Sequence, residues 1–430
     1  MQAKTNLALF GGAPIISTSF QKFSTIDESD EYAVSRVMKT RVLSEFIGSD
    51  GDYFLGGKEV RTFESNFQKF FGVEYSISVN SWTSGLWVAI GALGLDPGSE
   101  IITSPWTMVA AATTILHWNL IPVFADIDSQ TFNLDPNSVE EKISDNTRAI
   151  LSPDIFGQSA DIEGLMQICN KYNLVLISDS AQSPMSTRNG YFTGTASHIG
   201  GFSFNHHKHI QTGEGGMLVT NNAYFADRMQ LLRNHGEIVI GRRNPDQRQF
   251  GILGMNMRLG EIEASIGSNQ LKKLEKSVNS RISAANRLKD GIKHLEGLSV
   301  PVISEGNTHV FYVFGICINH NQIGVSQKRI FDALVAEGVP ALMLGYQNLH
   351  KIPLFDLQLT YRTNPLPYSL ISRRRAKQLK NQELPVAEHL HNNSFIGINW
   401  CAFEYSDSEV DLIIAAFEKI WKNLYLLRYS

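Results

Sequence analysis

The sequence predicts an α/β protein in which a large domain with a mostly parallel central sheet, flanked by helices, precedes a smaller C-terminal α+β domain. From about residue 80 to residue 220, short apolar runs alternate with stretches of helical period. Such alternation is typical of a parallel sheet with helices on its faces. The length of 430 residues also exceeds what one small core needs, so it favours one large and one smaller domain.

An N-terminal arm, residues 1–55, is predicted to precede the large domain of residues 56–300. The arm is irregular and rich in glycine, with room for a short helix. Six apolar runs in the large domain have the length and composition of buried strands. These runs are Ile101–Thr103, Pro122–Ala125, Ala149–Leu151, Leu174–Ile177, Gly201–Phe204 and Gly216–Val219. Helices are expected between them, for example at 84–95 and 162–172.

The segment 258–294 keeps a helical period, which predicts one long helix connecting the two domains. The apolar residues spaced for one face of it are Ile262, Ile266, Leu271 and Leu274. In the predicted small domain, residues 301–430, strands and helices alternate on a smaller scale. Its last helix begins with a capping box formed by Ser406 and Glu409.

Composition and charge argue against several classes of protein. The net charge is only −4, so a general electrostatic attraction to nucleic acid or an anionic membrane is not expected. The N-terminal residues lack the pattern of a signal peptide, and no apolar run approaches membrane-spanning length. The three cysteines are widely spaced, which argues against a disulfide framework and a CxxC metal site. We therefore expect a soluble, cytoplasmic protein.

A lysine in a glycine-rich turn is the first candidate for chemistry. Lys208 lies between the predicted strand that holds Ser203 and the run Gly213–Gly216. From such a turn a lysine can reach into a cleft, where burial or a nearby cation lowers its pKa. The neutral amine is then a nucleophile toward an aldehyde. A single lysine in a loop is more often an exposed surface residue. Whether Lys208 is a nucleophile therefore depends on the neighbouring features of the sequence.

Two further signals lie at the ends of predicted elements. Asp179 follows a predicted strand, at the edge where open α/β sheets bind ligands, and could pair with a pyridinium nitrogen. Thr83 and Ser84 stand at a predicted helix start, whose N–H groups and dipole suit a phosphate. Each signal alone fits a helix cap or a turn equally well. Together, and in this order, they are what a site for pyridoxal 5′-phosphate (PLP) needs.

In these residues the chain resembles the DegT/DnrJ/StrS family of PLP-dependent aminotransferases, which have the fold-type-I architecture and mostly aminate sugars. The resemblance extends from about residue 9 to the C-terminal helix. Its most specific segment is 203–216, which contains the serine, the lysine and the GEGG run. The other matching segments are 96–102, 175–182, 256–258, 270–271 and 383–388.

The resemblance implies a catalytic role for two residues. Lys208 would hold PLP as a Schiff base and would carry a proton between the substrate Cα and the C4′ carbon of the cofactor. Asp179 would pair with the pyridine nitrogen, and Gln182 would hydrogen-bond near the 3-hydroxyl group. The amino donor would be glutamate or glutamine, and the cofactor would cycle through pyridoxamine phosphate.

The resemblance also implies how phosphate and substrate are held. Ser203 would bind the phosphate together with Thr83 and Ser84. Asn256 would reach the phosphate from the partner subunit, which implies a homodimer with shared active sites. The acceptor would be a keto-sugar, first of all a nucleotide-linked one, used for surface polysaccharide or a glycosylated natural product. A free keto-cyclitol or a keto acid sugar is the alternative acceptor.

The chain departs from the family pattern at three positions. Trp82 replaces the usual glycine before Thr83, where it would crowd the phosphate loop or wall the substrate pocket. Asp154 replaces a histidine and would change the charge of that wall. Where the family has an aromatic residue that stacks on the cofactor ring, this chain has Met108, and the nearby Trp106 is the rival candidate.

The small domain near Tyr346 is expected to contribute to the acceptor pocket. Of the three histidines that flank Lys208, His207 is taken as a substrate contact. A metal site is not expected, because adjacent residues on an extended loop point to opposite sides and no cysteine lies at ligand spacing.

Two other functions compete with aminotransfer. In a sugar dehydratase of the same family, histidine replaces the Schiff-base lysine. A regulatory chain that has kept the fold needs no intact site at all. Lys208 in register between Ser203 and Gly213, together with Asp179 and Gln182, favours an aminotransferase over both.

Overall fold

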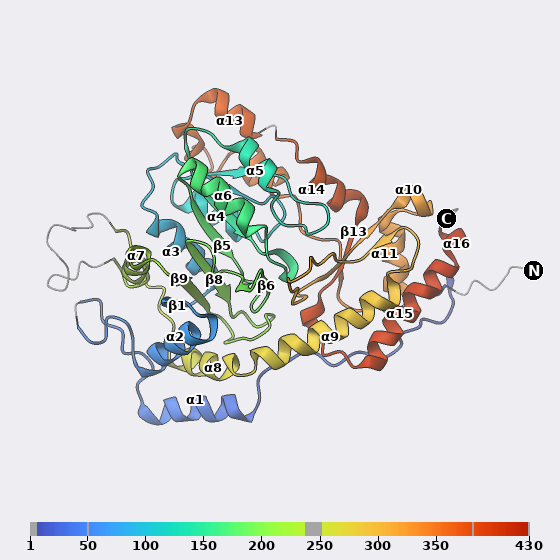
Figure 1. Ribbon diagram of the computed structural model, residues 1–430, viewed down its shortest axis with the longest axis horizontal. Helices are drawn as coiled ribbons and strands as arrows, with labels where there is room; N and C mark the ends of the chain where they lie inside the picture. Colours follow the sequence, from blue (N-terminus) through green and yellow to red (C-terminus); the bar gives the residue numbers. More distant parts are fainter. Residues whose placement is uncertain (1–6, 50, 237–251, 381, 429–430) are drawn as a thin grey trace, which may run out of the picture.

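The computed structural model describes residues 7–49, 51–236, 252–380 and 382–428, and its larger part is built on a seven-stranded sheet (Figure 1). The strand order is β1-β9-β8-β5-β4-β2-β3. The bounds are β1 Tyr75–Val79, β2 Glu100–Thr103, β3 Ile121–Phe124, β4 Thr147–Pro153, β5 Val175–Asp179, β8 Ile199–Ser203 and β9 Gly216–Thr220. Only β9 runs against its neighbours, and the other six strands share one direction. The predicted mostly parallel sheet is therefore confirmed.

Helices cover both faces of this sheet, which explains why its strands carry buried apolar residues on both faces. Successive residues of a strand point to opposite faces. Ile101 and Ile177 accordingly share a core with one set of helices, whereas their neighbours Ile102 and Leu176 belong to a second core. The first set is α3 Trp82–Ala92, α4 Ala110–His117 and α7 Ala223–Arg233. The second core includes α5 Pro136–Lys142 and α6 Ile162–Tyr172, and a third cluster contains α2 Lys58–Phe71.

A second sheet of four antiparallel strands follows, as predicted for the C-terminal part of the chain. Its strand order is β10-β11-β13-β12. The bounds are β10 Leu298–Ser299, β11 Phe314–Ile318, β12 Leu342–Met343 and β13 Phe395–Ile398. Helices α11 Gln327–Ala336 and α15 Asp407–Lys422 pack with it in one apolar core. The capping box of α15 is formed by Ser406 and Glu409, which confirms that prediction.

The predicted single helix over 258–294 is in fact two helices, α8 Glu261–Leu271 and α9 Leu274–Ile292. At the break, the backbone N–H groups of Lys272 and Lys273 bond to carbonyls only three residues earlier, which tightens the turn. The break separates α8, which packs on α1 and α2, from α9, which packs on α15. Figure 1 shows α9 in yellow running from below the large sheet toward α15.

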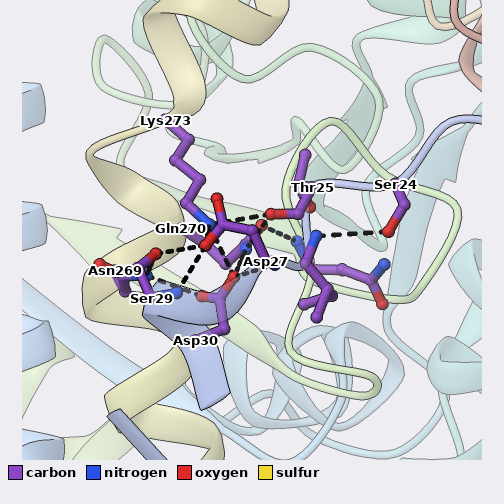
Figure 2. Close-up of polar contacts among 10 residues, drawn as sticks. Ser24, Thr25, Asp27, Ser29, Asp30, Asn269, Gln270 and Lys273 are labelled. Carbon is purple, nitrogen blue, oxygen red and sulfur yellow. Dashed lines mark hydrogen bonds and ion pairs between the residues drawn. The ribbon is translucent and has the colours of Figure 1, made fainter. Parts of the chain in front are cut away.

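The N-terminal segment contacts both parts of the molecule. Leu7, Ile16 and Phe20 are buried in the core of the second sheet, and α1 Glu28–Thr40 packs on α8. Figure 2 shows the polar network at the start of α1. In this network Lys273 Nζ lies 2.6 Å from Asp30 Oδ2 and 2.8 Å from Asp27 Oδ1. Within the described ranges, no helix is both long and apolar enough to span a membrane.

Candidate active site

The turn between β8 and β9 carries Lys208 into the interior of the protein. Ser203 pairs with Gly216 in the two strands, and the turn is closed by hydrogen bonds such as Lys208 N–H to the Asn205 carbonyl at 2.9 Å. The Lys208 side chain is buried, with Nζ 4.3 Å from the centre of the Tyr312 ring. Burial lowers the lysine pKa to about 8, although the charge of Asp179 acts in the opposite direction. Lys208 is therefore a buried amine that can act as a nucleophile near neutral pH.

Asp179 is the last residue of β5, the strand beside β8. Both of its hydrogen bonds use Oδ1, which accepts from Trp82 Nε1 at 2.6 Å and from the Ala181 N–H at 3.2 Å. Oδ2 thus has no protein partner among the described residues. Burial raises the carboxyl pKa, and the bond from Trp82 opposes that shift. A buried carboxylate with one free oxygen suits a protonated ring nitrogen.

A cavity of about 180 Å³ brings most of the predicted site residues together. Of the predicted residues, those that line it are Lys208, Asp179, Gln182, Ser203, Thr83, Met108, Trp82, Asp154, His207 and Tyr346. The remaining three, Ser84, Trp106 and Asn256, do not line it. Sequence reasoning missed Tyr312, whose ring packs against Lys208. Tyr312 lies in an aromatic run of the sequence, and nothing in that run distinguishes its ring from the rings that form the core.

The N-terminus of α3 contributes Thr83 to the cavity, while Ser84 belongs to the helix cap. The Ser81 side chain caps the helix by accepting from the Ser84 N–H at 3.1 Å, and the two hydroxyls are 2.9 Å apart. Thr83 is exposed. The first turn of α3 therefore presents a hydroxyl and the positive end of a helix dipole beside Ser203, as phosphate binding requires.

Gln182 is held from both ends of its amide. Its Oε1 accepts from the Phe156 N–H at 2.8 Å, and its Nε2 donates to Tyr346 Oη at 3.0 Å. Burial raises the pKa of Tyr346 to about 12, so its hydroxyl stays protonated. This contact joins the large sheet to a loop that follows β12.

The two candidates for stacking on a ring occupy different surroundings. Trp106 is fully buried, its Nε1 donates to the Tyr346 carbonyl, and it packs edge-on against Phe156 and Phe395. Met108 is half exposed and lines the cavity. Of the two, only the Met108 side chain is placed to touch a ligand there.

The two polar candidates for substrate contact also differ. Asp154 is 3% exposed, and its carboxylate accepts from the Ala160 N–H at 2.8 Å and from Ser180 Oγ at 2.6 Å. Burial raises its pKa to about 7. The ring of His207 lies at the exposed edge, and burial together with the charge of Lys208 lowers its pKa to about 4. At neutral pH His207 is therefore an uncharged donor or acceptor.

Asn256 lies away from the cavity of its own chain. It is exposed, and it forms an isolated bridge with Asn234. The Asn234 side chain in turn donates to the carbonyls of Ile47 and Phe54. Asn256 is therefore exposed beside Asn234, whose side chain is bonded to the backbone at Ile47 and Phe54.

A buried lysine and an aspartate at neighbouring strand ends, beside a helix N-terminus, define a PLP-dependent enzyme of fold type I. The residues fit the cofactor, because an amine of lowered pKa, a free carboxylate oxygen and phosphate donors line one cavity. Residues 42–393 match the DegT/DnrJ/EryC1/StrS aminotransferase family, and the chain belongs to it. It is accordingly a PLP-dependent aminotransferase, as predicted.

Individual relatives agree with this assignment. GDP-perosamine synthase from Vibrio cholerae is 32% identical over 302 residues, which cover 70% of this chain and 80% of the relative. L-glutamine:2-deoxy-scyllo-inosose aminotransferase from Streptomyces lividus is 29% identical over 87% of this chain and 88% of its own. The X-ray structure of an aminotransferase from Psychrobacter cryohalolentis matches with a TM-score of 0.79 and 26% identity, over 95% of this chain and all of that one.

Proposed function

We propose that the enzyme transfers an amino group from glutamate or glutamine to a keto-sugar, with a nucleotide-linked sugar as the first candidate. The observation that carries this proposal is Lys208, buried beside Asp179 with a lowered pKa. The names of two relatives, a GDP-perosamine synthase and a glutamine:scyllo-inosose aminotransferase, indicate the acceptor class. The second name keeps a free keto-cyclitol as the alternative acceptor.

Bound PLP supplies an aldehyde carbon and a ring that accepts electrons. The residues of this chain would position it and move protons. Lys208 Nζ would hold the cofactor at its aldehyde carbon, C4′, and would carry a proton from the donor Cα to that carbon. Asp179 Oδ2 would keep a proton on the ring nitrogen. Thr83 and Ser203 would hold the phosphate at the start of α3.

The dehydratase alternative is disfavoured by the surroundings of the histidines. His209 is fully buried, and its Nε2 lies 3.0 Å from the Val310 carbonyl, within the protein. His209 does not line the cavity. His207 does, but Lys208 lines the cavity as well. A buried lysine in the cavity therefore supports aminotransfer over dehydration.

We also propose a homodimer in which Asn256 completes the site of the partner. The support is two groups of exposed apolar side chains, one beside Asn256 in sequence and the other between α1 and α2, where the Asn234 side chain bonds to the backbone. They are Val42, Leu43, Ile47, Tyr53, Leu253 and Met255, between 38% and 71% exposed. Exposed apolar side chains that lie together are typical of a surface that a second chain covers.

The proposed reaction is tested by following each half-reaction separately. The purified enzyme with PLP should release a 2-oxo acid from glutamate or glutamine without any acceptor. The aminated cofactor form should then return to PLP when the correct keto-sugar is added from a panel of nucleotide-linked sugars and keto-cyclitols. Lys208→Ala should abolish both steps, while Lys276→Ala, at an exposed lysine, should change neither. A wild-type enzyme that binds PLP but deaminates neither donor would contradict the proposal.

A further inference from the structure

The side chain of Trp82 lies under the cofactor pocket, bonded to the residue expected to hold the ring nitrogen. Trp82 is the first residue of α3 and is only 6% exposed. Its indole Nε1 donates to Asp179 Oδ1 at 2.6 Å, a short bond to a buried carboxylate. The indole N–H is thus engaged inside the protein, although Trp82 also lines the cavity.

Two glycines leave the space that this indole fills, and a third lets β9 approach the backbone of Trp82. A Cβ atom at Gly201 in β8 would overlap the far edge of the indole ring. A Cβ at Gly85, in the next turn of α3, would lie 2.5 Å from Cε3 of the same ring. A Cβ at Gly216 in β9 would lie 2.9 Å from the Trp82 Cα. Because Gly201 and Gly85 leave the space for the ring and Gly216 admits the backbone beside it, the position of the indole is set by close packing.

The bond from Trp82 has a direct consequence for the carboxylate of Asp179. With Oδ1 occupied by the indole and by the Ala181 N–H, rotation of the carboxylate would break two hydrogen bonds. Oδ2 is therefore left as the oxygen that can meet a ligand. We propose that Trp82 is a positioning residue, which fixes the Asp179 carboxylate so that Oδ2 pairs with the ring nitrogen of PLP.

This inference rests on the proposed role of Asp179 and assigns to Trp82 a role different from a wall of the substrate pocket. A positioning residue acts on the cofactor, so its loss changes how the ring nitrogen is held whether or not substrate is present. A wall residue acts on the acceptor and leaves the cofactor unchanged. The two roles therefore predict opposite results in the substrate-free protein.

The experiment compares Trp82→Phe with wild type by measuring PLP affinity and the ¹⁵N chemical shift of ring-labelled PLP. Phenylalanine keeps an aromatic ring but lacks the N–H donor. We expect PLP to bind about tenfold more weakly, since losing a hydrogen bond to a charged group costs roughly 1.5 kcal/mol or more. We also expect the ring-nitrogen shift to move toward the unprotonated value. The matched control is Trp87→Phe, in the same helix but packed on Trp118 and outside the cavity.

A second variant protects the test against a packing defect. A benzothienyl analogue of tryptophan at position 82 has sulfur in place of the indole N–H and nearly the same shape. It should reproduce the weaker PLP binding and the changed shift while keeping the wild-type Tm. If both variants bind PLP with the wild-type affinity and shift, the inference is wrong. Failure of the proposed Asp179 role would appear separately, as an unprotonated ring nitrogen already in the wild-type protein.

Discussion

Gln182 and Tyr346 join two distant parts of the chain at the cavity, with Gln182 Nε2 donating to Tyr346 Oη at 3.0 Å. The other end of the amide accepts from the Phe156 N–H at 2.8 Å, so the direction of the side chain is fixed. The loop after β12 is thereby attached to the segment that follows β5. A movement of that loop would therefore shift the Gln182 side chain and any ligand bound to it.

Tyr346→Phe should loosen this connection. The variant leaves Gln182 Nε2 without its partner, which costs about 1 kcal/mol for a buried group. We expect a Tm lower by a few degrees and faster release of PLP, because the Gln182 amide can then turn. Thermal unfolding and the rate of PLP loss after dilution measure the two effects. Tyr191→Phe, at a tyrosine that is 65% exposed, is the control, and equal behaviour of the two variants would contradict the prediction.

The reactivity of Lys208 should depend on pH with a midpoint near 8. Only the neutral amine attacks an aldehyde, and burial lowers the lysine pKa to about 8. The rate at which the apoprotein binds PLP covalently should therefore rise as the pH increases through 8 and then level off. Stopped-flow absorbance measures this rate, with Lys208→Ala as the unreactive reference. A rate that still rises steeply above pH 9.5 would show that the lysine has an ordinary pKa.

Asp154 should reduce stability as the pH rises. Its pKa is about 7 in the folded protein, whereas the unfolded chain ionises near pH 4. Between these values the folded state binds more protons, so the free energy of unfolding falls as the pH increases. Asp154→Asn removes this loss, which amounts to about 4 kcal/mol at most for three pKa units.

Urea unfolding of Asp154→Asn and wild type at pH 5 and pH 8 measures the difference. The variant should gain stability relative to wild type between the two pH values. Asp145→Asn, at an exposed aspartate, should show no such gain. Parallel pH dependence of wild type and Asp154→Asn would show that Asp154 does not titrate in this range.

The proposed shared site predicts complementation between two inactive chains. Lys208→Ala removes the nucleophile, and Asn256→Ala removes a group expected to serve the partner. When the two variants are co-expressed, random pairing should restore about a quarter of the wild-type activity, since half of the dimers then have one intact site. Equal mixtures measured by steady-state kinetics give the answer. No recovery in dimers confirmed by light scattering would contradict the proposed role of Asn256 in the site of the partner.

The sequence pattern predicted the large sheet well because its physical cause is local. Strands buried on both faces must be apolar throughout, and this composition is legible in runs such as Ile101–Thr103. Lys208 could be placed because Ser203 and Gly216 pair directly and so fix the turn between them. The division at residues 55 and 300 stays a prediction.

Side-chain direction was harder to predict, because it depends on contacts distant in sequence. Trp106 and Met108 are two residues apart, yet only the structure shows that one enters the core and the other the cavity. The helical period of the sequence continues through Lys272 and Lys273, but the helix itself breaks there. The break lies between the part that packs on α1 and α2 and the part that packs on α15. From the sequence, Trp82 is expected to crowd the phosphate loop or to wall the substrate pocket. Its bond to Asp179 could not be predicted, because the two residues meet only in the folded chain.

The polar network at the start of α1 should hold the N-terminal segment in place. Asp30 is 2% exposed, and Lys273 is the cation that neutralises it at 2.6 Å (Figure 2). Lys273→Met would leave that buried carboxylate with only neutral donors, the side chains of Asn269 and Gln270 and the Asp27 N–H. Breaking a partly exposed ion pair in this way costs about 1 to 3 kcal/mol, between the values for surface pairs and fully buried pairs.

We therefore expect Lys273→Met to lower the Tm and to make the segment before α1 more sensitive to proteases. Both should follow from one cause, because the same lysine also donates to the Thr25 carbonyl at 3.0 Å. Lys272→Met is the matched control, since Lys272 is the exposed neighbour and takes no part in the network drawn in Figure 2. If the two variants unfold at the same temperature and are cleaved at the same rate, the network does not hold the segment, and apolar burial of Leu7, Ile16 and Phe20 is sufficient to do so.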